Sequence, residues 1–234
     1  MGISDKIEEM YRKRENVHIS YTQPLNPCHE KVAELICKYS NDNDKLLDIG
    51  CGVGHTLSEV NKRKPSLNLF AADIDDTTLA ITKENVPLEE SFKITTVEDL
   101  FDQGLNFDVI IMSHVLEHTR RPLDVLEGLV EMVKPKGIVI LAVPNPVRLQ
   151  VFVGNIIKKH YVNRGHVYAW DRSHWINFLE NIAGLNVIEY SQDFFPLPLR
   201  SKLRFVIGPI EQFLARVFPW LAFSNIAVIQ VDEK

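Results

Sequence analysis

A strand-like run followed at once by three closely spaced glycines constrains the fold of this chain more than any other feature. Residues 45–49 read KLLDI, and Gly50, Gly52 and Gly54 follow before a helical pattern that runs to about Lys64. Glycine permits a tight turn and lets backbone N–H groups approach a ligand closely. The helix N-terminus behind such a turn offers free N–H donors. This strand–turn–helix unit predicts a ligand site, the alternative being glycines that only reverse the chain.

The glycine spacing separates two classes of cofactor. Nicotinamide and flavin enzymes carry G-x-G-x-x-G after a strand. Here the spacing is G-x-G-x-G, and Gly54 is followed by His55 and Thr56. Asp48 lies two residues ahead of the first glycine, where a carboxylate repels a pyrophosphate but attracts a cation such as the amino group of S-adenosylmethionine. The loop therefore favours S-adenosylmethionine over a dinucleotide.

Short β-branched runs alternate with helical patterns along the chain, which indicates βαβ units and a mostly parallel sheet. Seven strands are predicted, at residues 45–49, 67–74, 92–97, 107–115, 137–143, 185–190 and 225–231. Helices are predicted from the glycine loop to about residue 64, after Asp75 or Asp76, from Pro122 to the KPKG run, and at about 172–183 and 209–218. The expected fold class is α/β, with helices on both faces of the sheet.

The composition is that of an ordinary globular chain, with 234 residues, 45% hydrophobic and 24% charged. The N-terminal segment has mixed charge and no apolar run, so no signal peptide is expected. No apolar stretch approaches the roughly 18 residues of a transmembrane helix. Cys28, Cys37 and Cys51 fit neither a paired disulfide set nor a zinc site. We therefore expect a cytoplasmic protein.

Charge is distributed unevenly around a formal net charge of −5. Residues 41–145 hold 10 Lys and Arg against 18 Asp and Glu, a net charge of −8. Residues 146–220 hold 9 against 5, a net charge of +4. An acidic chain argues against wholesale nucleic-acid binding, and the basic bias lies outside the half expected to bind the cofactor.

Three motifs occur in the order that one enzyme family shows. They are LLDIGCGVG, FAADIDDTTLAITKEN and FDVIIMSHVLEHTRRPLDVLEGLVEMVKPKGIVILAVPNP. With them, residues 45–145 resemble the class I S-adenosylmethionine-dependent methyltransferases, in particular the type 11/type 23 group. The resemblance implies a Rossmann-like, doubly wound seven-stranded sheet whose last strand is antiparallel. It also implies a methyltransferase domain over 41–234, an N-terminal helical extension over 1–40, and acceptor-side lid insertions at 147–170 and 196–223.

The resemblance also assigns residues to the cofactor, S-adenosylmethionine. Asp73 ends the second strand, where the family's acidic residue accepts hydrogen bonds from both ribose hydroxyls. The chain departs from the family pattern after the third strand, where Thr96 stands in place of the acid, so the Val97 backbone and the Glu98 carboxylate become the adenine candidates. The set expected to bind the cofactor is Asp48, Gly50, Cys51, Gly52, Gly54, Asp73, Ile74, Val97, Glu98 and Ser113.

Two histidines are the candidate catalytic residues. A general base accelerates methyl transfer to a hydroxyl by roughly 10²–10⁴-fold, and histidine suits that task near neutral pH. His114 ends the fourth strand at the expected site, and His166 follows Gly165 in the lid segment. The alternative for each is a packed or surface imidazole without a chemical role.

A metal site is the alternative explanation of the segment around His114. Some quinone-pathway O-methyltransferases in this group hold a divalent metal with Glu-x-x-Glu-His, and this chain has His114, Glu117 and His118 in that spacing. These side chains share one face if the turn is helical. Because V-L-E-H is also common in relatives without metal dependence, we expect no metal and a structural role for Glu117 and His118.

The C-terminal third is expected to contact the methyl acceptor. Its aromatic and polar side chains either line a pocket or pack the lid onto the domain: Tyr161, His166, Tyr168 and Trp170. An apolar helical stripe is expected to face the core, and consists of Ile210, Phe213, Leu214, Val217 and Phe218. The alternative is a peripheral membrane contact through residues 200–223, which carry basic flanks and Trp220.

Together these features predict an S-adenosylmethionine-dependent methyltransferase that modifies an oxygen of a small or lipid-linked acceptor, such as a sugar or a quinone. An RNA or protein methyltransferase is the second hypothesis, and it requires a continuous basic surface around the site. A catalytically silent cofactor-binding protein is the third, and the intact glycine loop and Asp73 count against it. The sequence identifies neither the acceptor nor the oligomeric state.

Overall fold

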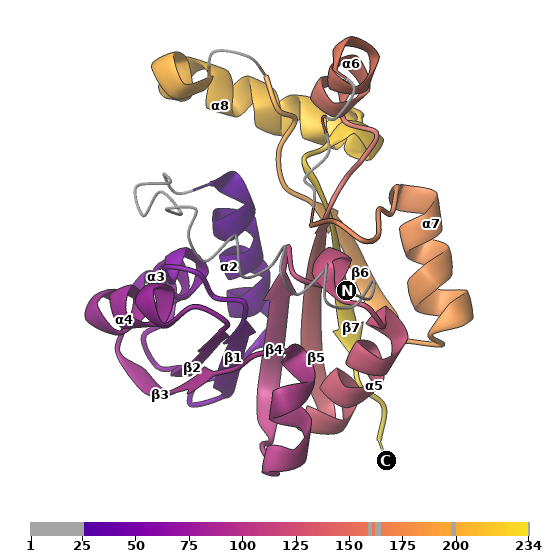
Figure 1. The fold of residues 1–234 in the computed structure, drawn as a ribbon. Coiled ribbons are helices and arrows are strands. Elements are labelled where there is room, and N and C mark those ends of the chain that lie inside the picture. The colour runs from indigo at the N-terminus through magenta and orange to yellow at the C-terminus, as the bar shows by residue number, and fades with distance from the viewer. Residues whose placement is uncertain (1–25, 159–160, 162–164, 198–199, 234) are drawn as a thin grey trace, which may run out of the picture.

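A computed structural model describes residues 26–158, 161, 165–197 and 200–233, with only the backbone described over 200–206 (Figure 1). Its strands form a single sheet, and the prediction of seven strands is confirmed. Their bounds are β1 Lys45–Ile49, β2 Asn68–Asp73, β3 Leu88–Lys93, β4 Phe107–Ser113, β5 Val133–Pro144, β6 Val187–Gln192 and β7 Ser224–Gln230.

The strand order is β3-β2-β1-β4-β5-β7-β6, and β7 runs antiparallel to both of its neighbours. The chain winds outward from β1 in both directions, because β1 pairs with β2 on one side and with β4 on the other. The doubly wound sheet with an antiparallel last strand is therefore confirmed. In such a sheet, ligands bind beyond the carboxyl ends of the parallel strands, where the strand order reverses.

Helices cover both faces of the sheet, as predicted. One core cluster joins α2 (Pro27–Tyr39), α3 (His55–Arg63) and α4 (Asp76–Asn85) to one face. The other joins α5 (Pro122–Met132), α7 (Arg172–Ile176) and the π-helical turn that continues α7 over Asn177–Ile182. Residues 1–25 lie outside the described residues, so the helical extension over 1–40 can be followed only through α2, and the division into domains stays a prediction.

The predicted third strand, at 92–97, is placed too far along the chain. The strand is β3, Leu88–Lys93, and residues 97–103 form a 3-10 helix instead. Thr96 caps that helix, and the Asp99 carboxylate accepts hydrogen bonds from the Thr95 and Thr96 amides at 2.6 and 3.1 Å. This capping ends the extended run, although β-branched Thr95 and Thr96 favour a strand by propensity.

Two helices project beyond the carboxyl end of β5, at the top of Figure 1. They are α6 (Leu149–Ile157) and α8 (Arg200–Val217), and a 3-10 turn over Pro219–Leu221 leads from α8 into β7. Among the described residues, no helix has the length and apolar character needed to cross a bilayer. The predicted lid insertions contain these two helices.

The apolar stripe on α8 does not face the core, which corrects the sequence-based expectation. Ile210, Phe213 and Val217 are 47%, 64% and 45% exposed, whereas Glu211 is only 1% exposed. Glu211 fixes this orientation, because its Oε1 accepts a hydrogen bond from the Leu197 amide at 2.9 Å and its backbone oxygen accepts one from the Phe195 amide at 3.2 Å. The helix therefore turns its carboxylate inward and its apolar stripe outward.

Candidate active site

The glycine loop lies between β1 and α3, at the carboxyl edge of the sheet. Gly50, Gly52 and Gly54 all have positive φ, at 76°, 54° and 77°. The Gly50 amide donates to the Ala72 backbone oxygen at 2.8 Å, which attaches the loop to the neighbouring strand β2. The predicted glycines thus form one tight, left-handed turn.

Asp73, at the end of β2, is hydrogen-bonded to the same loop. Its Oδ2 accepts a hydrogen bond from the Gly52 amide at 2.7 Å, and its Oδ1 accepts one from the Asp75 amide at 3.0 Å. Each carboxylate oxygen has a second lone pair, so both retain the capacity to accept from a diol. Burial raises the pKa of Asp73, and the amides of Gly52 and Asp75 oppose that shift.

Asp48 lies at the end of β1 and is 3% exposed. Burial raises the pKa of its carboxyl to about 8, and the negative charge of Asp73 contributes in the same direction. Two carboxyl groups enclosed together favour a bound cation, because a positive charge offsets both their burial and their mutual repulsion. The loop thus combines an acidic pocket with backbone donors.

The remaining cofactor candidates occupy the same edge with different exposures. Cys51 is 8% exposed within the loop, and Ile74, directly after β2, is 51% exposed. Val97 is buried at the start of the 3-10 helix, and Glu98 beside it is exposed. Ser113, at the end of β4, is half-buried, with its Oγ 4.0 Å from the Cys28 Sγ.

His114 follows β4 in a left-handed conformation, with φ 58°, which is uncommon for a residue other than glycine. Its Nε2 lies 2.9 Å from the Ser224 Oγ, and its Nδ1 lies 3.9 Å from the Glu117 Oε1. Burial, the Arg148 guanidinium and the neighbouring imidazoles hold the pKa of His114 well below its usual range. The imidazole is therefore neutral and a weak base.

A cavity of about 340 Å³ opens between the end of β5, helix α6, Tyr161 and residues 166–170. Its wall contains Glu117, Pro144, Asn145, Pro146, Arg148, Val151, Asn155, Tyr161, His166, Tyr168, Ala169 and Trp170. All four side chains that were candidates for a pocket wall lie on it, three of them aromatic. The expected second catalytic residue, His166, is thus in the cavity, whereas His114 is not among its lining residues.

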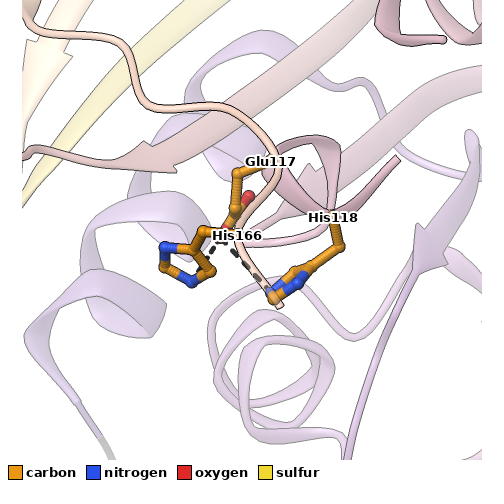
Figure 2. Close-up of side chains that lie close together, drawn as sticks. All are labelled: Glu117, His118 and His166. Atoms are coloured by element: carbon orange, nitrogen blue, oxygen red, sulfur yellow. Dashed lines mark ion pairs between the residues drawn. The ribbon is translucent and has the colours of Figure 1, made fainter. Parts of the chain in front are cut away.

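Glu117 is the centre of a side-chain cluster in this cavity (Figure 2). Its Oε1 lies 3.9 Å from the His114 Nδ1, 3.8 Å from the His118 Nε2 and 3.8 Å from the His166 Nε2. The side chain is 1% exposed, and neither carboxylate oxygen accepts a hydrogen bond from the described residues. Burial raises the pKa of this carboxyl to about 7, against the effect of its own backbone amide.

The backbone of Glu117 holds the lid segment in place. Its carbonyl oxygen accepts hydrogen bonds from the amides of Val167 and Tyr168, at 2.8 and 3.2 Å. The His118 Nδ1 lies 2.8 Å from the Gly165 oxygen, which orients that ring. One ligand atom each from Glu117, His118 and His166 lies within 4.8 Å of the others, a spacing that a metal ion can bridge. His114 is outside that group, so the geometry differs from the predicted metal alternative.

This fold and this loop geometry agree with one family of known proteins. A family described as the methyltransferase domain matches residues 20–190. The chain belongs to this family.

Relatives of the methyltransferase domain include two curated enzymes named ubiquinone biosynthesis O-methyltransferase. The one from Rickettsia bellii is 32% identical over 145 residues, covering 59% of this chain and 58% of the relative. The one from Cereibacter sphaeroides is 36% identical over 155 residues, covering 60% and 62%. The chain thus spans about three fifths of the length of the curated relatives it matches.

Solved structures show the same fold at low sequence identity. A SAM-dependent methyltransferase from Archaeoglobus fulgidus is 18% identical, with a TM-score of 0.57, over 86% of this chain and 94% of that one. Magnesium protoporphyrin IX methyltransferase from Synechocystis, solved with bound SAH, is 13% identical, with a TM-score of 0.59, over 98% and 88%. The predicted family, fold and cofactor class are therefore confirmed, whereas the individual site residues stay predictions.

The residues of this methyltransferase domain fit its family's cofactor. Among the described atoms, none lies within 4 Å of where a Cβ at Gly52 would stand, so the backbone there can approach a ligand. The two buried carboxyl groups suit a cationic amino acid moiety, and Asp73 retains acceptor capacity for a ribose. The donor set thus matches S-adenosylmethionine better than the pyrophosphate of a dinucleotide.

Sequence reasoning missed Arg148 and Asn145. Arg148 lines the cavity, its guanidinium lies 4.2 Å from the centre of the Phe223 ring, and its Nε has no hydrogen-bond acceptor among the described residues. Asn145 is fully buried and donates to the backbone oxygens of Trp220 and Ala222 at 2.8 and 3.0 Å. The Pro-Asn-Pro run at the end of a strand, followed by a lone arginine, was the available signal.

We expect Gly50→Ala to destabilise the fold more than Gly52→Ala does. Both positions have positive φ, so each substitution costs about 1–2 kcal/mol of backbone strain. A Cβ at Gly50 would also stand 2.2 Å from the Val115 Cγ2, which adds about 1–3 kcal/mol, whereas none of the described atoms lies within 4 Å of one at Gly52. Chemical denaturation of both variants measures the difference.

A double-mutant cycle with Val115→Ala isolates the steric part of this loss. Removing the Val115 methyl groups is expected to recover part of the stability of the Gly50→Ala protein and none of that of Gly52→Ala. Equal losses for the two glycine variants, with no coupling to Val115, would show that the loop is not closely packed there.

Proposed function

We propose that the protein transfers the methyl group of S-adenosylmethionine to a hydroxyl oxygen of a small or lipid-linked acceptor. The observation that carries the proposal is Glu117, whose buried carboxylate accepts no hydrogen bond from the described residues and which belongs to the wall of the cavity at the carboxyl end of the sheet. A hydroxyl must lose its proton as the oxygen becomes methylated, and such a carboxylate suits the role of proton acceptor. The relatives named as ubiquinone biosynthesis O-methyltransferases support an aromatic, quinone-like acceptor.

S-adenosylmethionine supplies an electrophilic methyl group on a sulfonium when it is bound. Asp73 would accept hydrogen bonds from the ribose hydroxyls of this cofactor. The glycine loop and Asp48 would hold the cofactor's amino acid moiety. The Val97 backbone, Glu98, Ile74, Cys51 and Ser113 remain the proposed surroundings of the rest of the cofactor. The protein's contribution is to hold the acceptor oxygen close to the methyl group and to exclude water, which can supply on the order of 7–11 kcal/mol in favourable cases.

The cavity wall suits a flat, largely apolar acceptor. Tyr168 and Trp170 stack at 5.4 Å between ring centroids with planes 12° apart, and Val151 and Pro144 add apolar surface. Glu117 and Arg148 are ionisable groups on this wall, together with His166, Tyr161 and Tyr168. A phenolic ring with its hydroxyl toward Glu117 satisfies both kinds of surface. A sugar is the alternative acceptor, for which Asn155 and Tyr161 supply polar groups.

We assign to Glu117 the role of accepting the proton of the acceptor hydroxyl. His166 would stabilise the charge that develops beside it during the transfer. His114 is the weaker candidate for the base, because its pKa is depressed and its ring is engaged with Ser224. Its expected role is to position Glu117, whose Oε1 lies 3.9 Å from the His114 Nδ1. The cytoplasmic location also stays a prediction.

A panel of acceptor probes tests the proposal. The purified chain is incubated with S-adenosylmethionine carrying a radioactive methyl group and, separately, with a soluble catechol, a methyl glycoside, bulk RNA and a mixture of peptides. We expect label in the catechol or the glycoside, in a product whose methyl group mass spectrometry places on oxygen. Label confined to RNA or peptide would establish the second hypothesis. Cofactor binding without transfer to any probe would support the silent cofactor-binding protein.

A further inference from the structure

We propose that α6 and the C-terminal half of α8 form a docking surface for an anionic lipid bilayer. The cap face, as we name it, consists of exposed apolar side chains on these two helices and the turn after α8. On α6 they are Leu149, Phe152, Val153, Ile156 and Ile157, and around α8 they are Ile210, Phe213, Val217, Phe218 and Trp220. Their exposed fractions run from 38% to 74%.

Most apolar side chains of helix α6 are exposed to solvent, whereas a surface helix normally turns them toward the domain. Its buried residues are Val151 and Gly154, and a Cβ at Gly154 would stand 2.4 Å from the ring of Tyr161. This close packing fixes the rotation of the helix, so Phe152 and Ile156 point outward at 59% and 71% exposure. A helix on the surface of a soluble domain normally buries its apolar side.

Helix α8 repeats the arrangement with a different anchor. The buried and hydrogen-bonded Glu211 fixes its rotation, and Phe213 lies outward at 64% exposure. Trp220 follows at 51% exposure, and Phe218 stacks edge-on against it at 5.8 Å. Apolar and aromatic side chains on two helices that lie beyond the same end of the sheet suit a helix pair resting in the interface of a bilayer (Figure 1).

The charge of these segments selects an anionic surface. Residues 146–170 and 196–223 together contain 8 Lys and Arg against a single acid, Glu211, which is buried. Their net charge is +7, and the rest of the chain, with 18 basic and 30 acidic residues, has −12. Among the described side chains, Lys158 at the end of α6 and Arg216 on α8 are exposed. Basic groups next to an interfacial helix are attracted to anionic lipid, whereas two copies of such a surface repel each other. A bilayer is therefore favoured over a second copy of this chain.

The cap face is continuous with the acceptor cavity. Val151 and Asn155 of α6 line that cavity, while Phe152 and Ile156 on the same helix point outward. A hydrophobic acceptor leaving the bilayer would reach Glu117 beneath α6. Delivery of the acceptor from the bilayer to Glu117 rests on the proposed function, whereas docking to the bilayer does not.

Sedimentation with lipid vesicles tests the docking. The full chain is mixed with phosphatidylcholine vesicles containing phosphatidylglycerol, and with vesicles of phosphatidylcholine alone. We expect binding to the anionic vesicles, weakened by high salt, and at least about tenfold weaker binding for Ile156→Asp. Ile182→Asp is the matched control, because Ile182 is 56% exposed on the π-helical turn after α7, outside the cap face. Lys158→Glu is expected to weaken binding, and Lys83→Glu on α4 is not.

Two results would overturn the proposal. One is the absence of binding to anionic vesicles, and the other is an equal loss for Ile156→Asp and Ile182→Asp. Self-association that Ile156→Asp abolishes, without vesicle binding, would make the cap face a dimer interface instead. Calorimetric titration with S-adenosylhomocysteine and catechol methylation are measured without vesicles on the same variants. Failure of docking is thus distinguished from failure of the proposed function.

Discussion

Asp73→Ala is expected to weaken the binding of S-adenosylhomocysteine by at least roughly 100-fold. Two hydrogen bonds from ribose hydroxyls to a carboxylate contribute about 1.5–3 kcal/mol each, and every 1.4 kcal/mol is a factor of ten in affinity. The substitution also removes the acceptor of the Gly52 amide, so the glycine loop loses its attachment to the Asp73 side chain. Isothermal titration calorimetry measures both dissociation constants directly.

Asp76→Ala is the matched control for this variant. Asp76 begins α4 three residues further on, its side chain is 78% exposed, and it forms a surface ion pair with Lys93 at 3.4 Å. Its replacement should leave the affinity unchanged within about twofold, since surface ion pairs contribute about 0–1 kcal/mol. Equal affinities for Asp73→Ala and the wild-type protein, or binding of NAD in place of S-adenosylhomocysteine, would contradict the assignment of the cofactor site.

Glu117→Gln is expected to reduce the rate of methyl transfer by roughly 10²–10⁴-fold while leaving the affinity for S-adenosylhomocysteine nearly unchanged. The amide has the shape of the carboxyl group but does not accept the proton of the acceptor hydroxyl. Glu211→Gln is the matched control, because Glu211 is the other glutamate among the described residues that is only 1% exposed. Initial rates with the acceptor that the panel identifies give the comparison, and thermal unfolding of each variant separates lost activity from lost structure.

The pH dependence of methyl transfer is expected to follow the pKa of Glu117, which burial raises to about 7. The base acts in its deprotonated form, so kcat/KM should rise with pH through about 7 and then level off, and the profile of Glu117→Gln should be flat there. The ring nitrogens of His114, His118 and His166 lie 3.8–3.9 Å from this carboxylate, and Arg148 lines the same cavity. Infrared difference spectra detect protonated carboxyl groups without any acceptor: the band that titrates near pH 7 should be absent from the variant, whereas the band of Asp48, whose pKa burial raises to about 8, should remain.

A metal ion would explain the same cluster differently. If Glu117, His118 and His166 hold an ion, dialysis against a chelator abolishes methyl transfer and zinc or manganese restores it. The proton-acceptor role predicts full activity after dialysis. Restoration by metal would therefore overturn the proton-acceptor role of Glu117, while leaving the family and the cofactor site unaffected.

The sequence was most informative where function depends on local backbone geometry. The glycine loop and Asp73 lie within one βαβ unit, so spacing along the chain predicts their proximity in space. The strands β1 and β4 were also predicted closely, because both are short, mostly apolar runs whose central residues are buried on both sides of the sheet. The third strand was misplaced because capping at Thr96 outweighed the strand propensity of residues 92–97.

The acceptor side was less predictable, because its contacts join distant segments. Glu117 meets His166 only through the fold of the lid, and Ser224 reaches His114 from the last strand. Periodicity identified the apolar stripe on α8 but did not tell which side of the helix the domain covers. That choice depends on Glu211 and on the backbone of residues 195–197, which no local pattern reveals.

The double use of Glu117 links two steps of a catalytic cycle. Its backbone oxygen fastens Val167 and Tyr168, and its side chain is closed off from solvent at 1% exposure. While the amides of Val167 and Tyr168 stay hydrogen-bonded to the Glu117 backbone oxygen, a proton that the Glu117 carboxylate has taken from the acceptor cannot pass to solvent. We infer that release of the methylated product and discharge of that proton are a single event, so a lid that opens more slowly would also delay regeneration of the base.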